Sequence, residues 1–122
     1  MSITNLQILD TTTVGTPSGN YDGSTTDFDS DGVLGVGYYR GQGNLQAVAI
    51  RVTGFVGRIT IQATLDDNWE DANWVDAYVD DSGALGPITN YSVTSLVGNY
   101  TWVRAKVTDF ESGTIQAIII SY

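Results

Sequence analysis

The sequence predicts an all-β protein, a two-sheet antiparallel β-sandwich of jelly-roll type with about seven or eight strands. Three observations predict this class. Apolar and polar residues alternate in several short stretches, β-branched and aromatic residues gather in those stretches, and no window combines helical periodicity with helix caps. The 14 glycines indicate many turns, and 122 residues is a common size for one domain with a single core.

The clearest strand lies between Gly57 and Leu65, where apolar and polar residues alternate strictly. The odd-numbered residues from 59 to 65 are Ile, Ile, Ala and Leu, and the even-numbered residues between them are Thr or Gln. Side chains of a strand point alternately to opposite faces. We therefore expect one face of this strand in the core and the other in water.

The N-terminal part of the chain predicts less regular structure. Residues 1–10 form a short apolar segment that fits either a first strand or an arm laid on a neighbouring molecule. Residues 11–32 are rich in Thr, Ser, Gly, Asn and Asp, which favours a long polar loop. We accordingly divide this single domain into an N-terminal arm and polar loop, residues 1–32, and a β-sandwich domain, residues 33–122.

Further strands are expected along the sandwich domain. They cover residues 33–40, 44–52, 58–65, 74–79, 91–97, 100–107 and 114–122. The second of them is apolar at both parities, so we expect it to be buried on most of both faces. The last two are separated by Asp-Phe-Glu-Ser-Gly, which has the length and the final glycine of a hairpin loop.

Composition excludes several classes of function. A net charge of −9 repels nucleic acid and anionic membrane surfaces, so we expect neither as a partner. Without His or Cys the chain cannot build a Ser-His-Asp triad, a Cys-His pair or a thiolate metal site. We predict a protein that is not an enzyme and requires no cofactor. No secretory signal or membrane-spanning segment is visible.

One local motif suggests calcium. Asp27, Asp29 and Asp31 occupy the first, third and fifth positions of a run with Gly32 at the sixth, which is how a calcium-binding loop begins. The position of the closing glutamate is Tyr38, so other ligands would have to come from elsewhere. Two interpretations stay open: a calcium site, or a solvated turn in which the Asp side chains bond the nearby backbone.

Half of the acidic residues surround two tryptophans between residues 66 and 81. Trp69 and Trp74 could stack on sugar rings with polar groups at the rim, which would make a glycan-binding site. The alternative is packing, with Trp74 in the core and Trp69 over one end of the sandwich.

Trp102, Arg104 and Lys106 share one parity of a predicted strand, opposite its apolar residues. Because Arg and Trp are favoured in interfaces, we predict that this row meets acidic loops of another copy. Replacing Arg104 with Glu should then weaken self-association more than stability. The predicted interface also includes the apolar N-terminal residues Ile3, Leu6 and Ile8. An intramolecular cation–π pair or a solvated face is the alternative for the row.

Several stretches together resemble small β-sandwich structural proteins of tailed bacteriophages, particularly those of marine and cyanobacterial phages. They are GRITIQATL at residues 57–65, Trp74, GNYTWVRAKV at residues 98–107 and GTIQ at residues 113–116, and the resemblance covers about residues 48–122. It implies a virion component, and within that group a capsid decoration or cement protein on the head lattice. A tail, neck or fibre component is the nearest rival.

The resemblance also implies partners, namely the major capsid protein or another virion protein, on the capsid surface, with the chain commonly a homotrimer. A second hypothesis, from a different class, is a carbohydrate-binding module, either free or serving phage adsorption to a host surface. Exposed coplanar rings of Trp69, Trp74 or Trp102 would favour the module. Burial of these rings at chain contacts would favour assembly.

Overall fold

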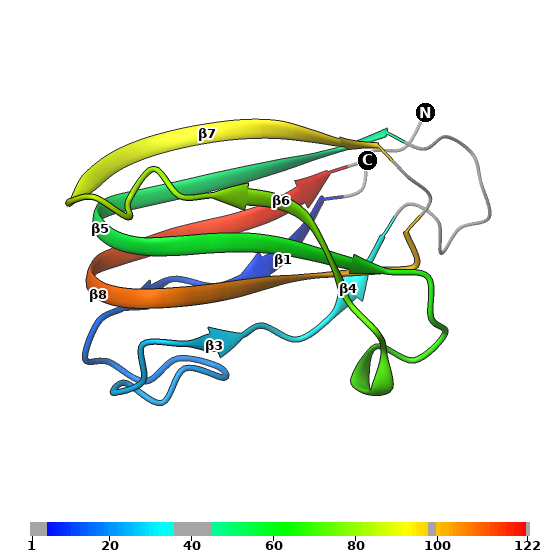
Figure 1. Ribbon diagram of the computed structural model, residues 1–122, viewed down its shortest axis with the longest axis horizontal. Coiled ribbons are helices and arrows are strands. Elements are labelled where there is room, and N and C mark those ends of the chain that lie inside the picture. Colours follow the sequence, from blue (N-terminus) through cyan, green and yellow to red (C-terminus); the bar gives the residue numbers. More distant parts are fainter. Residues whose placement is uncertain (1–4, 36–44, 98–99, 122) are drawn as a thin grey trace.

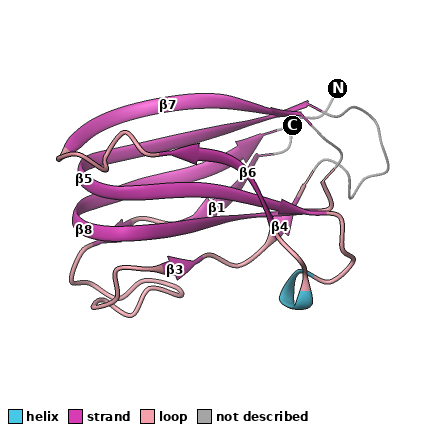
Figure 2. Cartoon of the chain, viewed as in Figure 1, coloured by secondary structure: helices cyan, strands magenta, loops and turns pink. Residues whose placement is uncertain are grey.

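The computed structural model describes residues 5–35, 45–97 and 100–121. These residues form eight antiparallel strands and one short 3-10 turn, η2 (Trp69–Asp71), as Figures 1 and 2 show. The strands are β1 (Asn5–Leu9), β2 (Thr12–Thr13), β3 (Phe28–Asp29), β4 (Val33–Leu34), β5 (Leu45–Thr64), β6 (Val75–Asp80), β7 (Ile88–Val97) and β8 (Trp102–Ser121). The all-β prediction is confirmed.

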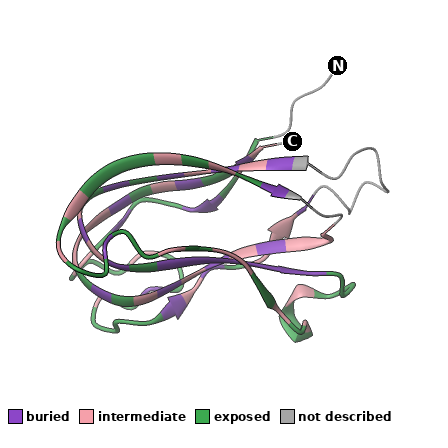
Figure 3. Ribbon diagram, turned by 45° about the horizontal axis from the view of Figure 1, so that its top comes forward, coloured by how far each residue is buried: buried purple, intermediate pink, exposed green. Residues whose placement is uncertain are grey.

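The two central strands, β5 and β8, are each 20 residues long and pair with each other along most of their length. Both bend near the middle, where the pairing register shifts several times. Figure 3 shows the two halves of the sheet, which meet at this bend. The predicted hairpin at residues 109–113 is therefore wrong, because β8 runs through it as one bent strand. The predicted strands 44–52 and 58–65 are likewise two halves of β5.

Glycine permits the bend where the two strands touch. Gly113 has a φ of +86° and Gly54 a φ of +59°, in the left-handed region that residues with side chains rarely adopt. A Cβ atom on Gly113 would overlap the carbonyl group of Gly54. The Ser112 hydroxyl donates a hydrogen bond of 2.7 Å to the same carbonyl oxygen. The sequence thus supplies glycine at a point where the two backbones approach too closely for a Cβ atom.

The bend divides one hydrogen-bonded sheet into two layers, which confirms the β-sandwich. In layer 1, the second half of β8 lies between β1 with β2 and the first half of β5, and β7 forms the edge beyond β5. In layer 2, the first half of β8 lies between β3 with β4 and the second half of β5, and β6 forms the edge.

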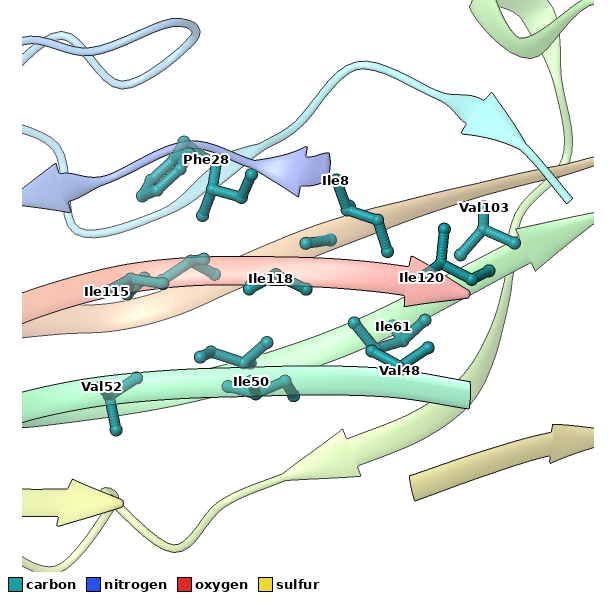
Figure 4. Close-up of a cluster of buried hydrophobic side chains, with 14 of the residues drawn as sticks. Ile8, Phe28, Val48, Ile50, Val52, Ile61, Val103, Ile115, Ile118 and Ile120 are labelled. Carbon is teal, nitrogen blue, oxygen red and sulfur yellow. The ribbon is translucent and has the colours of Figure 1, made fainter. Parts of the chain in front are cut away.

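The core fills the space between the layers, and Figure 4 shows apolar side chains from both halves of β5 and β8 directed into it. Close to the bend, four aromatic rings pack with centroid separations from 5.0 to 6.1 Å: Tyr21, Phe28, Phe55 and Phe110. Burial of each large apolar side chain contributes about 1.5–3 kcal/mol, so this core is the main source of stability.

Residues 5–32 are part of the sandwich. The strands β1, β2 and β3 all pair with β8, and Ile8, Leu9, Tyr21 and Phe28 are buried in the core. Of the two interpretations for the N-terminal segment, the first strand is the one found for residues 5–9. Residue 32 is therefore not a boundary between two parts of the structure.

Burial on β5 differs from the prediction in both halves. In the first half, Ala47 and Ala49 are half-buried and Arg51 is exposed, so this strand is not buried on both faces. In the second half, Thr60, Gln62 and Thr64 are all buried, although their parity predicted contact with water. Strand β4 covers only the first two residues of the predicted strand 33–40, and residues 36–40 lie outside the described part of the chain.

Candidate functional site

The sandwich has two outer faces of different character. We call the outer face of layer 2 the paired face, and it carries Asp29, Thr60, Gln62, Thr64, Trp74, Asp76, Trp102, Arg104 and Lys106. We call the outer face of layer 1 the open face, and it carries Ala47, Ala49, Arg51, Tyr91, Val93, Gln116, Ala117 and Ile119.

A row of polar side chains crosses the paired face from β3 to β6. Arg104 Nε donates to Gln62 Oε1 at 2.8 Å, and Gln62 Nε2 donates to Asp76 Oδ1 at 3.0 Å. Arg104 Nη1 lies 3.8 Å from Asp29 Oδ2, and the guanidinium carbon lies 4.5 Å from the centre of the Trp74 ring. Arg104 thus contacts Gln62, Asp29 and Trp74 of its own chain, as in the intramolecular cation–π alternative, with Trp74 as the aromatic partner.

The tryptophans of layer 2 are also held within the chain. Trp102 Nε1 donates to the carbonyl oxygen of Asp67 at 2.9 Å. Trp69 packs against Gly32, where an added Cβ atom would come within 2.7 Å of the Trp69 side chain. All three rings, Trp74 included, are only partly exposed. These contacts agree with packing rather than with a set of free sugar platforms, but Trp74 packs against Arg104 on the outer face and is not in the core.

The three aspartates of the calcium motif have three different partners. Asp27 Oδ1 accepts from the backbone N–H of Asp109 at 3.1 Å, Asp29 pairs with Arg104, and Asp31 Oδ1 accepts from Asn20 Nδ2 at 2.9 Å. In residues 5–35, 45–97 and 100–121, no group of three or more Asp, Glu, His or Cys side chains is placed to hold a metal ion. The contacts give the calcium interpretation no support.

The N-terminal residues of the predicted interface separate into three cases. Ile8 is buried in the core and Leu6 packs partly against it. Ile3 lies outside the described residues. Ile8 is therefore unavailable to a partner, because the sandwich itself uses it.

The open face is distinguished by its lack of carboxylates. None of the layer 1 residues of β1, β2, β5, β7 and β8 is Asp or Glu, although the chain has 14 such residues, and Arg51 is the only charged residue among them. Three large side chains are exposed on this face: Tyr91 at 59%, Val93 at 61% and Ile119 at 36%. Exposed apolar groups gathered in this way mark interaction surfaces.

A shallow groove runs over the open face. The Arg51 guanidinium carbon lies 4.7 Å from the centre of the Tyr91 ring. Two hollows, of about 220 and 410 Å³, share Arg51, Tyr91 and Gln116 as lining residues. Ala49 and Ala117 line the first, and Thr89 and Asn90 line the second. The groove thus offers an aromatic ring, a guanidinium group and amides.

Sequence reasoning missed this groove, since Arg51 and Tyr91 are 40 positions apart and meet only because β5 pairs with β7. The available signal is the absence of Asp and Glu from the stretches 45–64, 88–97 and 112–121 of an acidic chain.

In the described part of the chain, no helix has the length and hydrophobicity to cross a lipid bilayer.

Comparisons with known proteins identify the fold and no family. No protein-family model and no curated protein matches this chain. Among solved structures, the SPBc2 prophage-derived protein YomS is similar with a TM-score of 0.55 and 11% identity, over 98% of this chain and 90% of that one. The xylan-binding module CBM15 has a TM-score of 0.45 and 14% identity, over 98% and 95% of the two chains.

The K2 cleaved adhesin domain of Lys-gingipain is a more distant neighbour, with a TM-score of 0.38 and 12% identity over 78% of this chain and 58% of that one. Of these three neighbours, only YomS exceeds a TM-score of 0.5. The chain therefore shares its overall β-sandwich fold with a prophage-derived protein.

Proposed function

We propose that this chain is a non-enzymatic structural protein of a bacteriophage particle, and more specifically a capsid decoration or cement protein on the head lattice. The open face is the observation that carries the proposal. A protein of net charge −9 whose layer 1 strands contain no carboxylates, with exposed Tyr91, Val93 and Ile119, has a surface suited to another protein. The fold shared with YomS and the resemblance of residues 48–122 to phage structural proteins support the same role.

The fold suits a part that holds other proteins in place. Because β5 and β8 run through both layers, the layers form one hydrogen-bonded sheet and the open face has a stiff support. A lattice-bound protein gains strength from many identical weak contacts and needs no reacting groups. The partner on the particle would be the major capsid protein or another virion protein. The resemblance implies a trimer as the unit that docks.

Immunogold electron microscopy tests this role. Antibodies raised against the chain would be applied to phage particles from the organism that carries its gene. We expect label on the heads. Label confined to tails, necks or fibres would replace decoration by the rival position in the particle, and particles without any label would refute the proposal.

Carbohydrate binding is the second candidate, and the groove favours it. Sugar rings stack on aromatic faces while amide and guanidinium groups bond their hydroxyls, and the groove gathers Tyr91, Gln116 and Arg51 for such contacts. Titration calorimetry with neutral and uronic-acid oligosaccharides tests it. Binding that is lost in Tyr91→Ala and kept in Trp74→Ala would support a glycan site in the groove. The absence of heat with both sugar classes would count against it.

A further inference from the structure

We infer that β7 pairs edge to edge with β7 of a second copy of this chain, antiparallel and about a twofold axis, so that layer 1 continues across two molecules. The inference does not depend on which particle, if any, the protein belongs to. It names a partner and a contact that the open face alone does not specify.

The free edge of β7 is long and lacks the usual protection. β7 has ten residues and pairs only with β5 in the described part of the chain, so its other edge presents unpaired N–H and C=O groups. In Figure 1 it is the uppermost strand, with no described strand beyond it. Its sequence, ITNYSVTSLV, has no charged residue and no proline. Such an edge is a template for another strand.

The other edges of the sheet are protected. β6 carries Asp76 and Asp80, and its register with β5 is irregular between Ile61 and Gln62. On the opposite side, β2, β3 and β4 have two residues each and β1 has five. Charges, irregular register and short length all oppose the pairing of edges. β7 differs from all of these strands, and this makes it the edge open to pairing.

Charge points to a second copy as the occupant. Two molecules of net charge −9 repel each other, and the repulsion is weakest where their surfaces lack carboxylates. β7 lies in the layer whose strands contain none. Twofold pairing would bring Tyr91 and Val93 of both copies onto the same side of one joint sheet, where cross-strand neighbours cover each other. The exposure of these two side chains is then reduced at the seam, while the open face of the joint sheet stays accessible.

The symmetry of this contact has a measurable consequence. A strand that pairs with itself about a twofold axis uses the same residues on both sides and closes at two molecules. The phage resemblance implies three molecules instead. Light scattering of the purified protein across a range of concentrations should therefore give twice the monomer mass of 13.1 kDa.

A matched pair of variants tests whether the two copies meet at β7. Val93→Lys adds a charge at an exposed site of β7, and Val79→Lys adds the same charge at an exposed site of β6. We expect the first variant to be a monomer and the second to remain a dimer, with both melting temperatures within ~4 °C of the unchanged protein. Hydrogen exchange at the β7 amides of the unchanged protein should slow as its concentration rises.

Three results would overturn the inference: a monomer at every concentration, a threefold mass, or a Val93→Lys protein that still dimerises. Failure here is distinct from failure of the particle role. A dimer whose antibodies label no particle keeps the β7 contact and refutes decoration. Label on heads together with a stable trimer refutes the β7 contact and supports decoration.

Discussion

The two outer faces are made by halves of the same strands, β5 and β8, yet a network of polar contacts crosses one of them and a groove beside an exposed aromatic ring lies on the other. On the paired face, Arg104 donates to Gln62 and stacks on the Trp74 ring, and Gln62 is only 7% exposed. On the open face, the neighbouring positions of the same two strands are Ala49 and Ala117, which are too short to cover anything. The longer side chains beside these alanines, Arg51 and Tyr91, therefore border a groove on the open face, whereas Arg104 on the paired face is held by Gln62, Asp29 and Trp74.

The bend explains how one alternating sequence serves both faces. The inward residues of β5 are even-numbered up to Val52 and odd-numbered from Ile59 onward. The register shifts near Gly54 exchange the two parities. An alternation read straight across the bend therefore assigns half of the strand to the wrong face.

The greatest loss of stability is expected at the bend, where the strands that make both faces turn from one layer into the other. Gly113→Ala should lower the free energy of unfolding by about 3 kcal/mol, since the new Cβ atom would meet the Gly54 carbonyl group and a positive φ would be imposed on alanine. Gly15→Ala is the matched control, because Gly15 has a φ of +87° and no atom within 4 Å of an added Cβ. It should cost about 1 kcal/mol. Equal losses in urea denaturation would show that the close approach is unimportant.

The next effect compares the faces directly through their arginines. Arg104→Met should lower the free energy of unfolding by about 2 kcal/mol, because the buried oxygen of Gln62 loses its donor. Arg51→Met should change it by less than about 0.5 kcal/mol, as is usual for an exposed site. Chemical denaturation of both variants checks this. Similar losses would mean that the open face is as tightly constructed as the paired face.

This expectation reverses the sequence-based one for Arg104. From the sequence, replacement of Arg104 by Glu should affect association more than stability. In the structure Arg104 contacts Asp29, Gln62 and Trp74 of its own chain, so stability is the property that should fall. Light scattering of the Arg104→Glu protein at a temperature where it stays folded separates the two outcomes.

The smallest effect comes from the carboxylates that gather around layer 2. Burial, and then the charges of Asp80 and Asp81, raise the pKa of Tyr78 above its ordinary value of 10.0. The folded state thus favours the neutral phenol of Tyr78. The stabilisation that this preference gives the folded state is complete below pH 10 and is lost as the pH rises through the raised pKa. Denaturation midpoints measured between about pH 8 and 11 should fall less steeply for Tyr78→Phe than for the unchanged protein. Parallel curves would contradict the assignment.

Local sequence predicted the strands well where the chain is regular. The sequence predicts strands at residues 74–79 and 91–97, and β6 and β7 occupy residues 75–80 and 88–97. The prediction of a hairpin at residues 109–113 is wrong because a glycine after polar residues is equally suited to a hairpin loop and to a bend in a continuous strand. Only the pairing of β8 with β5 on both sides of the bend distinguishes the two.

The all-β class, the acidic charge and the lack of His and Cys chemistry follow from composition and local alternation, which carry these properties directly. Three other properties appear only in the folded chain: Arg104 contacts its own chain, the three aspartates of the calcium motif have separate partners, and Arg51 meets Tyr91. Each of these outcomes depends on which strands become neighbours and in which register. Register is set by packing across the whole sheet, and no single stretch of sequence contains it.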